Sequence, residues 1–409
     1  MSEPIYVIGH KNPDTDSIVS AIAYAYLKNQ IQDKKVIASC CGKINSETAF
    51  VLDYFDQEAP LLLEDVRPRA IDLLKEKYPT ISPQTSLQEA GNIMRQQGIK
   101  TLPVVNEKNR LLGILTVGDL ANLLLEAWDL GSFPMDEPVG KFMRTNGDLV
   151  YFHDNDLVDE IRQTMLETRY RNYPVVDEYD GFLGLISRYN LLALRGKQLI
   201  LVDHNEKSQA VCGIEQAEVV EIIDHHRIAD VETSEPILMR NEPVGSTATI
   251  VAKIFQEQNV PIPDTIAGLL CAAILSDTQI LKSPTTTAVD EKYASQLAAQ
   301  AQLDVVKFGK DMFKAGSNMA GRTGRDLLLE DFKEFNFGEH IVGIGQIQVV
   351  DGEEIEGKRA ELFQALEEME KEKGYDLVIL IITDLMRSGS ELLFAGKESR
   401  IMEKAFNAT

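Results

Sequence analysis

The stretch Gly9-His10-Lys11-Asn12-Pro13-Asp14-Thr15-Asp16-Ser17 lies between a short apolar run, Ile5-Tyr6-Val7-Ile8, and a longer one that begins at Ile18. The flanking runs predict a buried strand and a helix, so one imidazole and two carboxylates fall in a strand-to-helix turn. Similar clusters recur farther along the chain as Asp203-His204, Asp224-His225-His226 and Ser276-Asp277. Because parallel α/β sheets bind ligands at the carboxyl ends of their strands, we expect these clusters to converge. Mixed Asp and His clusters are typical of two-metal sites for attack of water on phosphorus.

Any one of these residues has an ordinary alternative role, because Asp caps helices and His satisfies buried hydrogen bonds. Four clusters at the ends of elements in one α/β domain favour a metal site instead. Imidazoles added to carboxylates favour Mn²⁺, Co²⁺ or Zn²⁺ over Mg²⁺. Lys282, in the segment Lys282-Ser283-Pro284-Thr285, is the candidate for binding substrate oxygens; a plain surface lysine is the alternative.

Length and charge restrict the class of protein. A chain of 409 residues predicts two or three domains, and 44% hydrophobic with 26% charged residues is typical of a soluble globular protein. The net charge of −23 argues against a nucleic-acid partner, because phosphate backbones require a basic surface.

The expected location is the cytoplasm, with no membrane partner. No apolar run reaches the length of a membrane span, and no basic segment followed by an apolar one opens the chain. The four cysteines show no Cys-x-x-Cys spacing, which favours buried free thiols over a zinc site or a disulfide.

The first domain is predicted to be split by an insertion. Apolar runs at 199–202 and 219–223 resume the strand and helix alternation of residues 1 to about 62, as in a buried parallel sheet. We therefore predict one α/β domain in two parts. The predicted boundaries are 1–64 and 197–303 for this domain, 65–196 for the insertion and 304–409 for a third domain. In the third domain we predict a linker at 304–309, strands at 341–344 and 377–382, and a charged helix at 355–373.

The insertion contains an internal repeat. Leu102-Pro103-Val104-Val105 recurs as Tyr173-Pro174-Val175-Val176, and Leu112-Gly113-Ile114-Leu115-Thr116 recurs as Leu183-Gly184-Leu185-Ile186-Ser187. Both matches keep one register, which indicates duplication. Each half, about 65–126 and 137–196, is predicted to run helix, strand, strand, helix. A purely structural repeat is the alternative to a ligand-binding one, because a fold does not by itself imply a function.

Both repeats resemble the cystathionine-β-synthase (CBS) domain. In that domain a strand is followed by Gly, two apolar residues, Thr or Ser and, three positions farther on, Asp. The resemblance implies a regulatory pair that binds adenine nucleotides (AMP, ADP, ATP or diadenosine polyphosphates) between its halves. We expect such a pair to pack against its own copy in a homodimer. In that family the Thr or Ser contacts phosphate and the Asp contacts ribose. The candidate nucleotide-binding residues are Lys100, Thr116, Asp119, Arg171, Ser187, Arg188, Tyr189 and Asn190, the last standing where the first repeat has its Asp.

The Asp/His clusters and Lys282-Ser283-Pro284-Thr285 resemble those of the manganese-dependent family II inorganic pyrophosphatases of the DHH phosphoesterase superfamily, and the likeness covers nearly the whole chain outside the insertion. It implies an α/β fold in which a DHH-type parallel-sheet domain, split by the CBS pair, precedes a smaller α/β domain of the DHHA2 type. It also implies hydrolysis of pyrophosphate to two orthophosphates at a Mn²⁺ or Co²⁺ pair, with Mg²⁺ on the substrate and a metal-bridging hydroxide as nucleophile. Carried over to this sequence, the metal ligands are His10, Asp14, Asp16, Asp203, His225 and Asp277, with Asp203 as the bridge; the catalytic residues are Asp203, His226 and Lys282; and the substrate-binding residues are His226, Lys282 and Ser283.

One departure from the family concerns the C-terminal domain, which in relatives ends with an Arg-Lys-Lys type motif that closes over pyrophosphate. The basic residues Arg387, Lys397, Arg400 and Lys404 are scattered here, so we expect either a truncated domain or another basic group in place of the motif. Truncation would impair pyrophosphate binding and turnover but not metal binding. Two other readings are an exopolyphosphatase or phosphodiesterase of the DHH superfamily, and an impaired sensor that binds only metals and adenylate.

Overall fold

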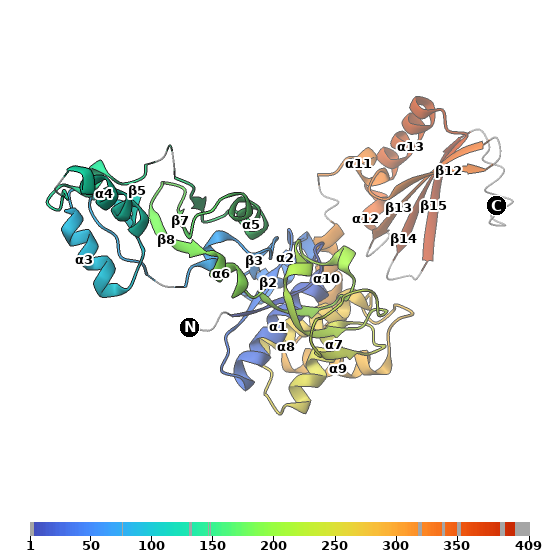
Figure 1. Ribbon diagram of the computed structural model, residues 1–409. Helices are drawn as coiled ribbons and strands as arrows, with labels where there is room; N and C mark the ends of the chain where they lie inside the picture. Colours follow the sequence, from blue (N-terminus) through green and yellow to red (C-terminus); the bar gives the residue numbers. More distant parts are fainter. Residues whose placement is uncertain are drawn as a thin grey trace. The chain divides into compact units, whose positions relative to one another are not determined.

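The computed structural model describes residues 4–75, 77–130, 133–145, 147, 149–317, 321–337, 340–349, 353–384 and 389–396. Figure 1 labels helices and strands of this part of the chain. The chain divides into two compact units. The first comprises Met1–Asp65, Gln198–Ile214 and Glu218–Thr409, and the second comprises Val66–Lys197 and Glu215–Ala217. Among the described residues, every helix is too short or too polar to cross a bilayer.

A six-stranded parallel sheet forms the centre of the first unit, with strand order β11-β10-β9-β1-β2-β3. The chain adds β2 and β3 on one side of β1 and then, after the insertion, β9, β10 and β11 on the other. The boundary between β1 and β9 is therefore the point where the strand order reverses, and open α/β sheets bind ligands beside such points. The strands are β1 (Ile5–Ile8), β2 (Val36–Cys40), β3 (Leu61–Leu62), β9 (Gln198–Val202), β10 (Glu218–Asp224) and β11 (Leu238–Asn241).

Apolar helices pack with this sheet in one continuous core. Residues 266–275 of α8 are all buried, which explains why this segment is apolar on every side rather than on one stripe. Most of α1 and α7 is buried as well. The helices of this part are α1 (Thr15–Ile31), α2 (Ser46–Tyr54), α7 (Thr247–Glu257), α8 (Asp264–Asp277), α9 (Ala288–Gln300) and α10 (Val305–Ser317).

The prediction of a linker at 304–309 is wrong. The Asp304 carboxylate accepts hydrogen bonds from the backbone N–H groups of Val306 and Lys307, at 3.1 and 3.0 Å, and α10 begins there. Phe308 and Met312 of α10 are buried in the core of the parallel-sheet part. Residues just beyond 303 therefore complete the first domain instead of leaving it.

The second unit consists of two copies of the predicted helix, strand, strand, helix arrangement. Each copy pairs its two strands antiparallel, β4 with β5 and β7 with β8. Gly113 is required on β5, because a Cβ there would lie 2.2 Å from the Arg144 carbonyl oxygen. The elements are α3 (Leu87–Gln97), β4 (Thr101–Val105), β5 (Leu111–Thr116), α4 (Val117–Leu130), β6 (Phe152–His153), α5 (Val158–Glu167), β7 (Asn172–Val176), β8 (Phe182–Ser187) and α6 (Arg188–Leu192).

The C-terminal part has its own four-stranded mixed sheet, in the order β12-β13-β14-β15. The single charged helix expected at 355–373 is two helices, α12 and α13. Arg387, Lys397, Arg400 and Lys404 lie outside the described residues, so the expected truncation stays a prediction. The elements are α11 (Gly324–Leu328), β12 (Phe332–Phe337), β13 (His340–Val349), α12 (Glu353–Glu356), α13 (Arg359–Lys373), β14 (Leu377–Asp384) and β15 (Gly389–Gly396).

Candidate metal centre

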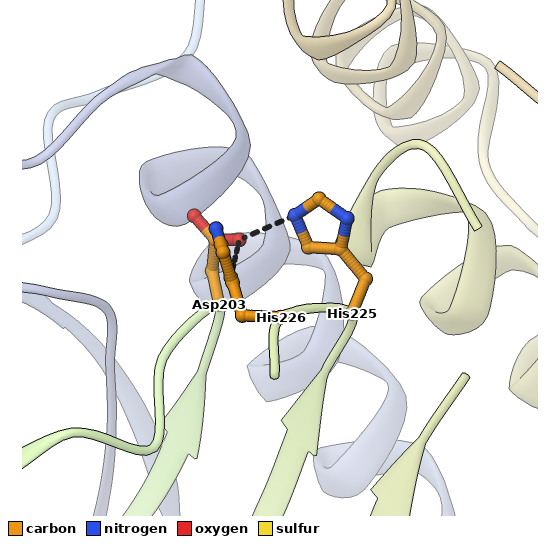
Figure 2. Close-up of side chains that lie close together, drawn as sticks. All are labelled: Asp203, His225 and His226. Atoms are coloured by element: carbon orange, nitrogen blue, oxygen red, sulfur yellow. Dashed lines mark ion pairs between the residues drawn. The ribbon is translucent and has the colours of Figure 1, made fainter. Parts of the chain in front are cut away.

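Three neighbouring parallel strands carry the Asp and His clusters at their carboxyl ends. His10 follows β1, Asp203 follows β9, and His225 and His226 follow β10. Figure 2 shows the Asp203 carboxylate facing the rings of His225 and His226, each side chain standing at the end of its strand. The sheet order β10-β9-β1 thus brings together segments that are far apart in the sequence.

The turn after β1 is held tightly at its start. Gly9 cannot carry a side chain, because a Cβ there would lie 1.7 Å from Ser17 Oγ. Asp14 caps α1 by accepting a hydrogen bond from the Ser17 backbone N–H at 2.9 Å. This close approach directs His10 and Asp16 to the edge where β9 and β10 end.

Asp203 is shared by three overlapping groups of ligand-type side chains. One of them, Asp203 with His225 and His226, overlaps the group around Asp277, so two ligand groups remain on the two sides of Asp203. In the first group, His10 Nε2 lies 3.3 Å from Asp14 Oδ2 and 3.5 Å from Asp203 Oδ2. In the second group, His225 Nε2 lies 3.4 Å from Asp203 Oδ1 and 3.5 Å from Asp277 Oδ2. Asp16 belongs to the second group, and within each group the candidate ligand atoms lie within 4.8 Å of one another. The two oxygens of Asp203 therefore face different groups.

Unpartnered buried atoms show that this arrangement fits metal ions. Asp203 Oδ2 and His225 Nε2 are both buried, and neither has a hydrogen-bond partner among the described residues. His225 Nδ1 lies 3.0 Å from the Val244 carbonyl oxygen, which fixes the proton on Nδ1 and leaves the Nε2 lone pair for a cation. Lone pairs left free in a buried carboxylate and a buried imidazole are what a metal ion requires.

The pKa values show which protons a cation would have to displace. Burial lowers the pKa of His10, but the nearby carboxylates of Asp14 and Asp203, 3.3 and 3.5 Å from Nε2, outweigh it and raise the pKa to about 10. Burial likewise opposes charge on His225, yet its contact with Asp203 raises the pKa to about 9. Before a cation binds, both imidazoles are therefore protonated, and Nε2 of each offers its lone pair only when the cation displaces that proton.

The carboxylates of the centre are shifted in opposite directions. Burial, followed by the charge of Asp203, raises the pKa of Asp16 to about 7. Burial, followed by the charges of Asp16 and Asp203, raises the pKa of Asp277 well above its ordinary value. Burial opposes ionisation of Asp203 too, but His10 and His225 on either side hold its pKa below the ordinary range. Asp203 is thus the carboxylate that stays ionised at the centre of the cluster.

The backbone is strained at and beside the centre. Asp203 has φ of 63°, and the three residues Gln279, Ile280 and Leu281 that follow α8 have φ of 50°, 56° and 60°. Non-glycine residues rarely adopt such angles, and Ile280 is β-branched. This left-handed turn determines where the next segment, Lys282-Ser283-Pro284-Thr285, leaves the helix.

Lys282 and Ser283 stand outside the two ligand groups, on the loop after that turn. Lys282 is exposed, and Ser283 Oγ lies 2.7 Å from Thr285 Oγ1. Their contact with substrate therefore stays a prediction.

Two supporting acidic residues were missing from the predicted set. Asp224 Oδ1 lies 2.9 Å from His226 Nδ1, and this hydrogen bond raises the pKa of His226. Glu47, on α2, accepts hydrogen bonds from Thr15 Oγ1 and Ser276 Oγ and so connects the segments of Asp14 and Asp277. The Asp224-His225-His226 pattern could have indicated the first, but no local signal points to Glu47.

The second unit contains a cavity of about 360 Å³ between its repeats. Three of the predicted nucleotide-binding residues line it, namely Lys100, Thr116 and Arg171; Asp119, Ser187, Arg188, Tyr189 and Asn190 are not among its lining residues. Sequence reasoning missed the basic and aromatic residues that complete the lining. These are Arg144, Arg169 and Tyr170, together with Asn172.

The two repeats hold their equivalent polar residues differently. Asp119 Oδ2 accepts hydrogen bonds from Thr116, and Asp119 Oδ1 accepts one from Arg144 Nε at 2.8 Å. In the second repeat, Asn190 Oδ1 accepts from Ser187, and its amide donates to the Leu73 carbonyl oxygen at 3.1 Å. Asp119 is thus paired with a charged side chain that lines the cavity, whereas the Asn190 amide is bonded to the main chain.

The ligand groups around Asp203 lie where the strand order of the parallel sheet reverses. The chain is therefore an α/β protein with a candidate two-metal centre. Residues 4–274 match the DHH family, N-terminal domain, and residues 310–409 match the DHHA2 domain. The chain is 34% identical to the cobalt-dependent inorganic pyrophosphatase of Clostridium perfringens, over 99% of this chain and 94% of that protein. It is 32% identical to the manganese-dependent inorganic pyrophosphatase of Bacillus subtilis, over 100% of this chain and 91% of that protein.

A solved structure of a putative family II inorganic pyrophosphatase from Methanococcus jannaschii is 29% identical, with a TM-score of 0.48 over 98% of this chain and 90% of that one. From the family matches and the curated relatives, the chain belongs to the DHH family and, within it, to the manganese- or cobalt-dependent inorganic pyrophosphatases of family II. The predicted family and the predicted α/β fold class are confirmed.

Proposed function

We propose that this chain hydrolyses inorganic pyrophosphate to two orthophosphates at the centre around Asp203, with Mn²⁺ or Co²⁺ as the resident pair and Mg²⁺ on the substrate. The observation that carries the proposal is that one ionised, buried carboxylate belongs to both ligand groups. The proposed ligands for one ion are His10, Asp14 and Asp203, and those for the other are Asp16, Asp203, His225 and Asp277. The four carboxylates among these ligands balance the charge of two dications. Such balance is needed because an unpaired buried charge is costly.

When bound, the two ions would supply the hydroxide nucleophile and neutralise the charge of the phosphoryl oxygens. The residues of the chain provide position and protons. Asp224 holds His226 through Nδ1, so we propose that His226 Nε2 faces the substrate and donates a hydrogen bond to a phosphoryl oxygen. Lys282 and Ser283 are proposed to bind the oxygens on the side away from the metal ligands.

The proposed substrate is tested by measuring orthophosphate release from pyrophosphate, tripolyphosphate and a dinucleotide side by side. We expect strong preference for pyrophosphate with Mn²⁺ or Co²⁺. Preference for tripolyphosphate or the dinucleotide would instead support the exopolyphosphatase or phosphodiesterase alternative. Binding of metal and AMP without release from any of the three would support the sensor alternative.

We further propose that residues 65–196 are a tandem CBS regulatory domain, with repeats at about 65–126 and 137–196. It would lie between a DHH segment at 1–64 and a second one that starts at 197 and ends with α10 rather than at 303, ahead of a DHHA2 domain. Adenine nucleotides would bind in the cavity between the repeats, with phosphate near Lys100, Arg144, Arg169 and Arg171. The lining supports this proposal, because several basic side chains, the Thr116 hydroxyl and the Tyr170 ring suit a phosphate and an aromatic base. The remaining proposed contacts are Asp119 with ribose and, in the second repeat, Ser187, Arg188, Tyr189 and Asn190.

Asp119→Ala is expected to leave basal pyrophosphate hydrolysis unchanged and to weaken the response to AMP. Loss of a hydrogen bond to a charged group costs about 1.5–3 kcal/mol, which corresponds to roughly tenfold or more in affinity. Calorimetric titration with AMP and turnover with and without AMP measure the two effects. Asp159→Ala, an exposed aspartate on α5 of the same unit, is the matched control; equal AMP binding by the two variants would contradict the proposed contact.

A homodimer and a cytoplasmic location complete the proposal. Large apolar side chains are exposed on α4 and α6, including Leu125 at 64% and Leu192 at 86%, which supports packing of the second unit against a second copy. All four cysteines are free, as expected for a reducing compartment, although Cys212 is exposed rather than buried as predicted.

A further inference from the structure

The first turn of helix α7 contacts two of the candidate metal ligands, although it supplies no ligand itself. Ser246 Oγ donates to Asp16 Oδ1 at 2.9 Å, and the backbone N–H groups of Thr247 and Ala248 donate to the same carboxylate at 2.6 and 2.9 Å. The Thr247 side chain reaches the other carboxylate, with Oγ1 donating to Asp203 Oδ1 at 3.1 Å. Thr247 is fully buried and is the residue that contacts both.

The contact with Asp203 comes from a residue that is not a candidate ligand, whereas the ion-pair contacts of this carboxylate are with His10, His225 and His226. The Thr247 hydroxyl is the nearer donor, whereas His10 and His225 approach the carboxylate at 3.5 and 3.4 Å and are themselves candidate metal ligands. The terminal torsion of an aspartate is broad, so a carboxylate with no fixed partner can rotate. A single donor at Oδ1 orients the carboxylate plane and leaves the remaining lone pairs for the two ligand groups.

We propose that Thr247 is a positioning residue, which sets the orientation of the Asp203 carboxylate and thereby the placement of both metal ions. The proposal rests on the proposed function only in taking Asp203 as a shared ligand. The Thr247 backbone N–H fixes Asp16 at the same time, so one residue connects two ligands of the second group. The N-terminus of α7 also favours negative charge, which stabilises the ionised form of Asp16 against its burial.

Thr247→Val tests this role, because it replaces the hydroxyl by a methyl group of similar volume and keeps the backbone N–H on Asp16. We expect binding of Mn²⁺ and Co²⁺ to weaken roughly 10- to 100-fold, as for other residues that hold a metal ligand in place. Thr247→Ser keeps the hydroxyl and should restore affinity close to that of the parent chain. Calorimetric titration and the visible absorption of bound Co²⁺ report these effects without any substrate.

Thr249→Val is the matched control. Thr249 lies on the same helix, is fully buried and donates to Asp290 Oδ1 at 2.6 Å, outside both ligand groups. In the absence of metal, Thr249→Val should therefore lose as much thermal stability as Thr247→Val. Its affinity for metal should equal that of the parent chain. With substrate, Thr247→Val should lower kcat more than it raises KM for pyrophosphate.

The proposal is overturned if Thr247→Val binds both ions with parental affinity, or if Thr249→Val weakens metal binding equally. Should Thr247→Val fail to fold, Thr247→Ala also removes the hydroxyl and is judged by the same criteria. A parent chain that binds two ions but releases no orthophosphate would refute the proposed function and leave this metal-affinity test intact.

Discussion

Asp203→Asn should abolish pyrophosphate turnover and weaken binding of both metal ions. Asp203 belongs to both ligand groups, and the substitution removes the negative charge and replaces one ligand oxygen by an amide nitrogen that cannot bind a cation. Asparagine tolerates the left-handed backbone at this position, where φ is 63°, so the fold should survive. We expect affinity for each ion to fall by more than the roughly 10- to 100-fold that loss of an outer partner costs.

Asp290→Asn provides the control for this variant. Asp290 is equally buried and accepts hydrogen bonds from the Gly245 backbone N–H and from Thr249, but it lies outside both ligand groups. It should retain two ions and most of its turnover, measured by metal titration and phosphate release. Near-parental turnover in Asp203→Asn would contradict the proposal that Asp203 is a ligand of both ions.

Metal affinity should rise steeply with pH. The pKa of His10 is about 10 and that of His225 about 9, so at pH 7 both imidazoles are protonated and must lose a proton to bind a cation. Each displaced proton contributes about tenfold in apparent affinity per pH unit below the pKa of its group. Between pH 7 and 9 we therefore expect a gain of at least about 100-fold at the site that contains His225, because the raised pKa of Asp277 at the same site adds a further proton to be displaced. At the site that contains His10 the gain should continue toward pH 10.

Calorimetric titration with Mn²⁺ in two buffers of different ionisation enthalpy measures the number of protons released. The raised pKa values belong to the metal-free chain, in which the imidazoles hold their protons. Metal affinity therefore increases with pH and levels off above these pKa values. His153→Gln, which changes an exposed histidine of the second unit, should leave the slope unaltered. An affinity independent of pH, with no proton release, would contradict this account of His10 and His225.

Much of the centre could be predicted from the sequence because strand ends are local features. Apolar runs that finish at His10, Asp203 and Asp224 predict strands, and parallel strands end at a common edge. The repeat of the insertion was equally visible, because both copies keep their register. The structure brings the predicted ligands together by placing β9 between β1 and β10.

The supporting residues could not be predicted, because long-range packing determines them. Thr247 and Glu47 stand in ordinary helical sequence and reach the centre only once α7 and α2 pack beside α1. Arg144 and Arg169 line the cavity of the second unit from segments outside the repeated motifs. The error at 304–309 has a related cause, since α10 is an amphipathic helix whose buried face became evident only against the core of the first domain.

The central claim is that two ions share Asp203 and act together on pyrophosphate. Its most direct test is a titration of metal-free protein with Mn²⁺, in which orthophosphate release from pyrophosphate is followed as a function of Mn²⁺ bound per chain. We expect two ions per chain, with turnover that appears as the second ion binds. Full turnover with one ion bound, or no turnover with two ions bound, would contradict it.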